Sequence, residues 1–152
     1  MVHIDHARGL VTVEAGIRLK ELCTQLLAQG LALINLGSIL EQSIAGAVST
    51  ATHGSGITFG NLATQVVAMR LVLASGEVLV VGPEQNAELL PALRVSLGAL
   101  GIVTQVTLRV VPTFYLHEER EPLPFGEVLP QLPALIPSAD HFKLWWFPHA
   151  PV

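Results

Sequence analysis

The residues best suited to chemistry in this chain lie in one stretch, residues 35–60, which read NLGSILEQSIAGAVSTATHGSGITFG. The stretch holds five glycines and a run of serine and threonine hydroxyls, with Glu41 as its one carboxylate. Glycine lets the backbone approach a ligand closely, and hydroxyls add donors beside exposed N–H groups. This composition favours an anionic phosphate held mainly by main chain, with a tight structural loop as the alternative.

The common nucleotide fingerprints are missing from the sequence. It has neither G-x-x-x-x-G-K-[ST] nor a G-x-G-x-x-G between a strand and a helix, so a P-loop enzyme or an ordinary Rossmann domain is not expected. His53 could in principle act as a base or ligand, but the other histidines have no metal-ligand spacing with it. We therefore expect no metal site.

The composition is unusually apolar for a free-standing domain of 152 residues, with 51% hydrophobic and 13% charged residues. The longest uncharged run, residues 42–69, is interrupted by glycines, which disfavours a spanning helix. We therefore expect apolar faces that further protein or a cofactor covers. The net charge of −4 argues against a nucleic-acid partner.

No basic region precedes an apolar run at the N-terminus, so no signal peptide is expected. The single cysteine, Cys23, can form no internal disulfide, which fits a reducing compartment. We expect a cytoplasmic protein, with peripheral membrane association left open.

Periodicity predicts an α+β protein. Apolar spacing predicts helices over residues 17–29, which place Cys23 on the buried stripe, and over residues 86–97, where Pro91 should kink the helix or mark its start. Alternation and turn residues predict the strands, which cover residues 10–14, 65–73, 77–81, 102–110 and 142–147. Seven of the ten prolines follow residue 112, which indicates a second domain.

Several blocks together carry a family resemblance: VTVEAG, QGLALINLGS, SIAGAVSTATHGSG, NLATQVVAMRLVLASGEV, RVSLGALGIVTQVTLRVVP and KLWWFPH. In this order and spacing they resemble the aldonolactone and alditol oxidases, which are FAD-binding flavoproteins of the vanillyl-alcohol-oxidase or PCMH type. The resemblance implies the second subdomain of a PCMH-type FAD-binding domain, with a mixed or antiparallel sheet and flanking helices. Residues 1–112 would belong to that domain, and residues 113–152 would begin the substrate domain.

The resemblance also implies roles for individual residues, many of them through backbone N–H groups. Gly54 would allow the close approach of the cofactor, and Gly37 would give dioxygen access to the flavin, which favours an oxidase over a dehydrogenase. The residues implied to bind FAD are Ser38, Ser43, Gly46, Thr50, Ala51, Thr52, His53, Gly54, Gly101 and Ile102.

The implied activity is oxidation of a sugar lactone or polyol, with hydride transfer to flavin N5 and reoxidation by dioxygen to hydrogen peroxide. Family members also have an upstream FAD subdomain, often with a histidine that bonds the flavin covalently, and a long substrate domain. Neither has a counterpart here, so we expect weak or no activity from this chain alone. The alternatives are a non-catalytic module that completes an FAD site with another chain, and a structural domain without a ligand.

Overall fold

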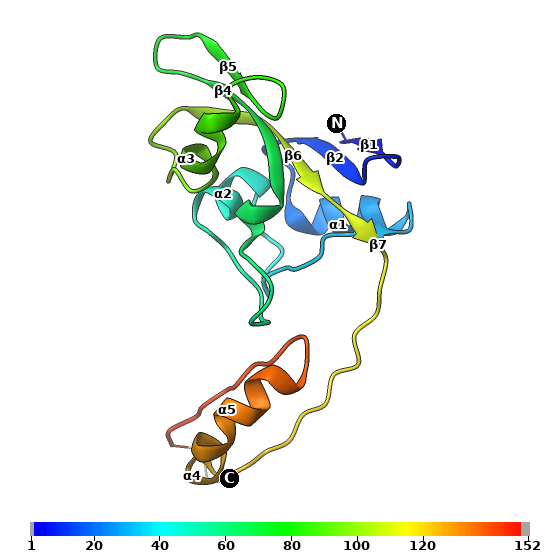
Figure 1. Cartoon of the computed structure of the whole chain (residues 1–152), viewed down its shortest axis with the longest axis vertical. Coiled ribbons are helices and arrows are strands. Elements are labelled where there is room, and N and C mark those ends of the chain that lie inside the picture. The colour runs from blue at the N-terminus through cyan, green and yellow to red at the C-terminus, as the bar shows by residue number, and fades with distance from the viewer. Residues whose placement is uncertain (1, 150–152) are drawn as a thin grey trace. The chain divides into compact units, whose positions relative to one another are not determined.

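The computed structural model describes residues 2–149, which form two compact units (Figure 1). The first unit comprises residues 2–54 and 60–114, and the second comprises residues 55–59 together with the chain from residue 115 onward.

The first unit contains a five-stranded antiparallel sheet in the order β1-β2-β6-β4-β5. A short additional pair joins β3 to β7. The strands are β1 (Val2–Asp5), β2 (Leu10–Glu14), β3 (Leu31–Ala32), β4 (Val66–Val72), β5 (Val78–Val81), β6 (Ile102–Arg109) and β7 (Val111–Pro112).

Helices pack against one face of this sheet because its strands alternate apolar and polar side chains. Val11, Val13, Val106 and Leu108 are fully buried and belong to one core cluster. That cluster also includes the buried face of α1 (Leu19–Leu27) and of α2 (Ile44–Ser49). The opposite side of β2 and β6 is polar, where the Thr12 and Thr107 hydroxyls lie 2.9 Å apart.

Most predicted elements are confirmed, with shifted boundaries. The strand over residues 102–110 is β6, and the hairpin is β4 and β5 around a turn in which Gly76 has a φ of 84°. The predicted helix over residues 86–97 is shorter, because it consists of the 3-10 helix η2 (Ala87–Leu89) and α3 (Leu90–Arg94). Pro91 lies in the first turn of α3, so it marks the start of that helix.

The predicted buried stripe on α1 is too wide. Leu19, Leu22 and Leu26 are fully buried, whereas Leu27 is exposed and Cys23 is half-buried. Burial nevertheless raises the pKa of the Cys23 thiol, which makes it a poor nucleophile.

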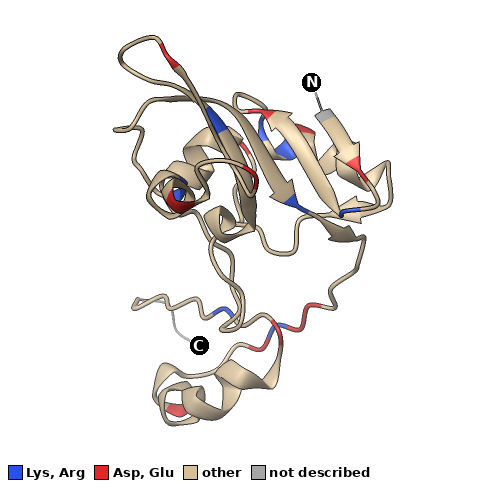
Figure 2. Ribbon diagram, turned by 45° about the horizontal axis from the view of Figure 1, so that its top comes forward, with Lys and Arg blue, Asp and Glu red and all other residues tan. Residues whose placement is uncertain are grey.

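The second unit is largely helical and irregular. It contains α4 (Phe125–Val128) and α5 (Leu132–Leu135), with short 3-10 turns η3 (Leu129–Gln131) and η4 (Ile136–Ser138). The strand predicted over residues 142–147 is wrong, because this segment pairs with no strand among the described residues. Between β7 and α4 the chain carries a short charged run of three glutamates and one arginine, Glu118, Glu119, Arg120 and Glu121 (Figure 2).

None of the helices among residues 2–149 combines the length and apolar character that crossing a bilayer requires.

Candidate cofactor site

The glycine-rich stretch contains a helix, α2, which the sequence did not reveal. Ser43 caps it, since its Oγ accepts a hydrogen bond from the Gly46 N–H at 3.2 Å. A serine cap of this kind stabilises a helix by about 1 kcal/mol. A Cβ at Gly46 would lie 3.3 Å from this same Ser43 Oγ, so glycine suits the tight cap.

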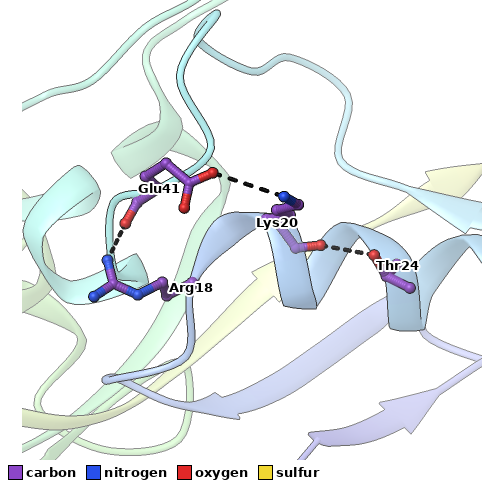
Figure 3. Close-up of polar contacts among 4 residues, drawn as sticks. All are labelled: Arg18, Lys20, Thr24 and Glu41. Atoms are coloured by element: carbon purple, nitrogen blue, oxygen red, sulfur yellow. Dashed lines mark hydrogen bonds and ion pairs between the residues drawn. The ribbon is translucent and has the colours of Figure 1, made fainter.

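The segment before α2 is anchored on the start of α1. The Leu19 and Lys20 N–H groups donate to the Gln42 and Leu40 carbonyls, each at 3.0 Å. The Arg18 guanidinium donates to the Glu41 carbonyl, and Lys20 Nζ lies 3.9 Å from a Glu41 carboxylate oxygen (Figure 3). These contacts satisfy the first N–H groups of α1 without a side-chain cap and fix the entry into α2.

Two parts of the glycine-rich stretch approach each other at glycines. A Cβ at Gly54 would lie 2.2 Å from both Asn35 Oδ1 and the Leu36 carbonyl oxygen, so no other residue fits there. A Cβ at Gly37 would lie 3.2 Å from the His53 carbonyl oxygen. Residues 35–37 and 52–54 therefore form two adjacent backbone segments, and the close approach at Gly54 is between parts of the chain itself.

Two buried amides hold this arrangement. The Gln65 Nε2 donates to the Asn35 carbonyl oxygen at 3.0 Å, and Asn35 Nδ2 reaches the Gly60 carbonyl at 3.5 Å. Both side chains are buried. Neither residue was predicted from the sequence to belong to the site. The sequence marks them only by position, because Asn35 begins the glycine-rich stretch and Gln65 follows its end.

Most backbone N–H groups expected to bind a ligand are already bonded within the chain. Thr50, Ala51 and Thr52 donate to the carbonyls of Gly46, Val48 and Ala47, at 2.9 to 3.2 Å. By contrast, the N–H groups of Gly37, His53 and Gly54 donate to no acceptor within the described part of the chain. The donors available to a ligand are therefore concentrated where residues 37 and 53–54 meet.

Side-chain polar groups stand beside these donors. The Gln42 amide and the Thr52 hydroxyl lie 3.3 Å apart, and the Thr50 hydroxyl donates to the Gly46 carbonyl at 2.9 Å. The His53 side chain is exposed, and its Nδ1 donates to the Gly54 carbonyl at 2.9 Å. Ser38 is exposed and follows Gly37 directly.

Ala51 holds a strained backbone in this stretch. Its φ of 53° lies in the left-handed region, which costs an alanine about 1–2 kcal/mol. Strained residues of this kind are concentrated at ligand sites. The strain at Ala51 is therefore an independent sign of a functional turn.

Gly101 and Ile102 lie at a second turn. Gly101 has a φ of 144° and a Cβ there would lie 2.8 Å from the Val72 carbonyl oxygen, so this position requires glycine. Ile102 is 72% exposed. The structure links this turn to α2 through the Leu97 N–H, which donates to the Ser49 carbonyl at 3.2 Å.

The fold of the first unit defines the class of protein. The structure matches 6-hydroxy-D-nicotine oxidase from Arthrobacter nicotinovorans with a TM-score of 0.67 and 23% identity, over 74% of this chain and 25% of that one. It matches cholesterol oxidase from Brevibacterium sterolicum with a TM-score of 0.64 and 24% identity, over 74% of this chain and 23% of that one. At these identities the likeness establishes a shared fold.

The sequence then identifies the family. Residues 1–82 match the family model described as FAD binding domain, and residues 106–152 match the model described as D-arabinono-1,4-lactone oxidase. The chain belongs to the FAD-binding-domain family, which confirms the family resemblance, the fold class and FAD as the cofactor.

Similar proteins include both oxidases and a dehydrogenase. L-gulonolactone oxidase of Bos taurus is 43% identical over 150 residues, which cover 99% of this chain and 34% of that protein. L-gulono-1,4-lactone dehydrogenase of Mycobacterium tuberculosis is 44% identical over the same coverage. D-arabinono-1,4-lactone oxidase of Yarrowia lipolytica is 42% identical over 95% of this chain and 28% of that protein. The chain thus spans about a third of these relatives.

The residues present fit an FAD. The N–H groups of Gly37, His53 and Gly54, for which no acceptor is found among the described residues, suit a polar or anionic acceptor, and the hydroxyls of Ser38 and Thr52 lie on the same backbone segments. FAD presents such acceptors on its pyrophosphate and its ring carbonyls.

Proposed function

We propose that this chain forms one wall of the FAD site of an oxidoreductase that acts on sugar-1,4-lactones or polyols. The observation that carries the proposal is the close approach of residues 35–37 to residues 52–54, which carry backbone donors without a partner among the described residues. The two family matches and the similar lactone oxidases support it.

In this proposal the chain's residues bind and orient the cofactor. The N–H groups of Gly37, His53 and Gly54 contact it directly, and Ser38 and Thr52 add hydroxyl donors. Ser43, Gly46, Thr50 and Ala51 set the course of the backbone through α2 and its end, since their own polar groups are used internally. Gly101 and Ile102 present a second stretch of backbone to the cofactor. Bound FAD supplies the capacity to accept a hydride from the substrate.

Gly37 supports oxidase chemistry in this proposal. It carries no side chain at the position where the family resemblance implies that dioxygen reaches the flavin. The relatives include a dehydrogenase at the same level of identity, so peroxide production with L-gulono- or D-arabinono-1,4-lactone is the discriminating assay. An oxidase forms peroxide with dioxygen, whereas a dehydrogenase requires an added electron acceptor.

We also propose that further protein completes the site, supplied by a longer chain or by a partner. Residues 1–112 would then be the FAD-binding part, and residues 113–152 would begin the substrate domain. Exposed apolar side chains beside the candidate contacts support this, since Leu97 is 76% and Ile102 is 72% exposed.

A flavin titration with one matched pair of variants tests the proposal. Gly37→Ala places a methyl group against the His53 carbonyl, whereas Gly16→Ala meets no atom within 4 Å. We expect the wild-type chain to quench flavin fluorescence, Gly16→Ala to bind equally well, and Gly37→Ala to bind FAD about tenfold more weakly or worse. Equal FAD affinity for all three proteins would contradict the proposed wall.

A further inference from the structure

The loop over residues 55–59 belongs to the second unit, although it lies within the glycine-rich stretch. It follows Gly54 directly, so one peptide bond joins it to the backbone donors of the candidate site. The base of the loop is closed where the Leu62 N–H donates to the Thr52 carbonyl at 2.8 Å. The N–H groups of His53 and Gly54 therefore lie between this closed base and the 55–59 loop.

His141 holds the 55–59 loop within the second unit. Its Nδ1 lies 3.0 Å from the Ser55 carbonyl oxygen and 3.2 Å from the Ser55 Oγ. Its ring stacks on the Phe59 ring, with the centroids 4.9 Å apart and an angle of 16° between the planes. The backbones are close as well, because a Cβ at Gly56 would lie 2.5 Å from the Asp140 carbonyl oxygen. The loop is thus fixed at both of its ends by His141.

The surroundings of Nδ1 decide which nitrogen of the His141 ring carries the proton. A carbonyl oxygen can only accept a hydrogen bond, so the contact with the Ser55 carbonyl requires Nδ1 to donate. An unprotonated Nδ1 would instead turn its lone pair toward those of the carbonyl oxygen. The neutral His141 ring therefore carries its proton on Nδ1.

We propose that His141 is a positioning residue for the cofactor wall, because its bond to the Ser55 carbonyl fixes the backbone that follows the His53 and Gly54 N–H groups. The inference rests on the proposed function, in which these N–H groups contact FAD. Thr52 fixes the chain before the two groups, and His141 fixes it after them. A segment held at both ends has less conformational freedom to lose when the cofactor binds, and this favours binding.

Two substitutions of His141 separate its hydrogen bond from its ring stack. Asparagine offers an amide N–H close to the place of Nδ1, whereas phenylalanine keeps a ring beside Phe59 and has no donor. We expect His141→Asn to bind FAD within about twofold of wild type and His141→Phe to bind about tenfold more weakly, by flavin-fluorescence titration of the full chain. His117→Phe is the matched control, since the His117 side chain is 86% exposed in the same unit, and it should bind as wild type does. In a chain that binds FAD, equal affinity of His141→Asn and His141→Phe would overturn the proposal.

NMR spectra of the chain without FAD test the role of His141 independently of the cofactor. Nitrogen-15 signals of the neutral imidazole should place the proton on Nδ1, and the amide signals of His53 and Gly54 should move in His141→Phe and stay in place in His141→Asn. Tryptophan emission checks that each variant keeps the second unit folded, because the chain's two tryptophans, Trp145 and Trp146, both lie there. A proton on Nε2, or amide signals that His141→Phe leaves unmoved, would overturn the proposal. A wild-type chain that binds no FAD would contradict the proposed function, whereas these spectra would still decide whether His141 holds the two N–H groups.

Discussion

The part of the glycine-rich stretch that lies in the first unit, residues 35–54, and the aromatic segment of the second unit, residues 142–147, use their backbones in opposite ways. The former is poor in large side chains, yet its course is determined by bonds to α1, by the Ser43 cap and by two buried amides. The latter is rich in residues that favour strands, yet it has no partner strand among the described residues. The comparison teaches that neighbours, more than local propensity, decide whether the backbone of a segment is hydrogen-bonded to the rest of the chain.

Gly54→Ala should have the largest destabilising effect on the glycine-rich stretch. The new methyl group would lie 2.2 Å from two oxygen atoms, one of them in the backbone, so the two adjacent segments must separate. We expect a loss of about 3 kcal/mol in the free energy of unfolding, measured by urea denaturation with far-UV circular dichroism. Gly16→Ala is the control. A Gly54→Ala chain as stable as Gly16→Ala would refute the close approach.

Gln65→Ala tests the buried amide that supports the same region. The substitution leaves the Asn35 carbonyl without the donor that Gln65 Nε2 provides, and a buried unsatisfied acceptor costs about 1–3 kcal/mol. We expect a loss in that range by urea denaturation, together with weaker FAD binding because residues 35–37 lose their support. Stability within error of wild type would show that this amide does not hold the stretch.

Ala51→Gly should stabilise the chain, in contrast to Gly54→Ala and Gln65→Ala. Glycine adopts a φ of 53° freely, so relief of strain outweighs the added chain entropy by about 0.5–1 kcal/mol. We expect a small gain in the unfolding free energy. Ala45→Gly, at an ordinary helical position in α2, should instead lose about 1 kcal/mol. Destabilisation by both variants would contradict a strained turn at Ala51.

Glu118→Gln should have the smallest effect. The Arg120 guanidinium bonds the Glu118 carboxylate and lowers its pKa, but both side chains are exposed to solvent. Because the pKa is lowered on folding, any stabilisation is present above the usual Glu pKa and is lost as the pH falls through the lowered value. We expect tryptophan-monitored denaturation curves of variant and wild type to coincide at neutral pH. A clear separation of the curves would show that this part of the chain is held by its ion pairs.

Local patterns in the sequence predicted the elements whose residues alternate or are bounded by turn residues or proline. Alternation revealed β2 and β6, the Ala74-Ser75-Gly76 turn revealed the hairpin of β4 and β5, and Pro91 lies at the start of α3, which was one of its two expected roles. The helix α2 was missed, because its six residues include a glycine and its stability comes from the Ser43 cap and from packing of Ile44 and Val48 in the core. The strand predicted over residues 142–147 was wrong because pairing depends on a partner that local sequence does not describe.

The structure brings some of the expected site residues close together, and the role of every one of them as an FAD contact stays a prediction. Family blocks located the glycine-rich stretch, and the structure brings Gly37 together with Thr52, His53 and Gly54. It also shows that the N–H groups of Gly46, Thr50, Ala51 and Thr52 are engaged internally, which no motif could reveal because it depends on the path of the chain. Their role as direct FAD contacts stays a prediction, as does that of Gly101 and Ile102.

The most direct test of the FAD wall is an amide NMR titration of the full chain with FAD. The account predicts that the amide signals of Gly37, His53 and Gly54 shift most, because their N–H groups have no partner among the described residues. The signals of Ile44, Ala45 and Ala47 should shift least, since these groups are bonded to carbonyls of the chain. Saturable binding that leaves the first three signals in place would contradict the account.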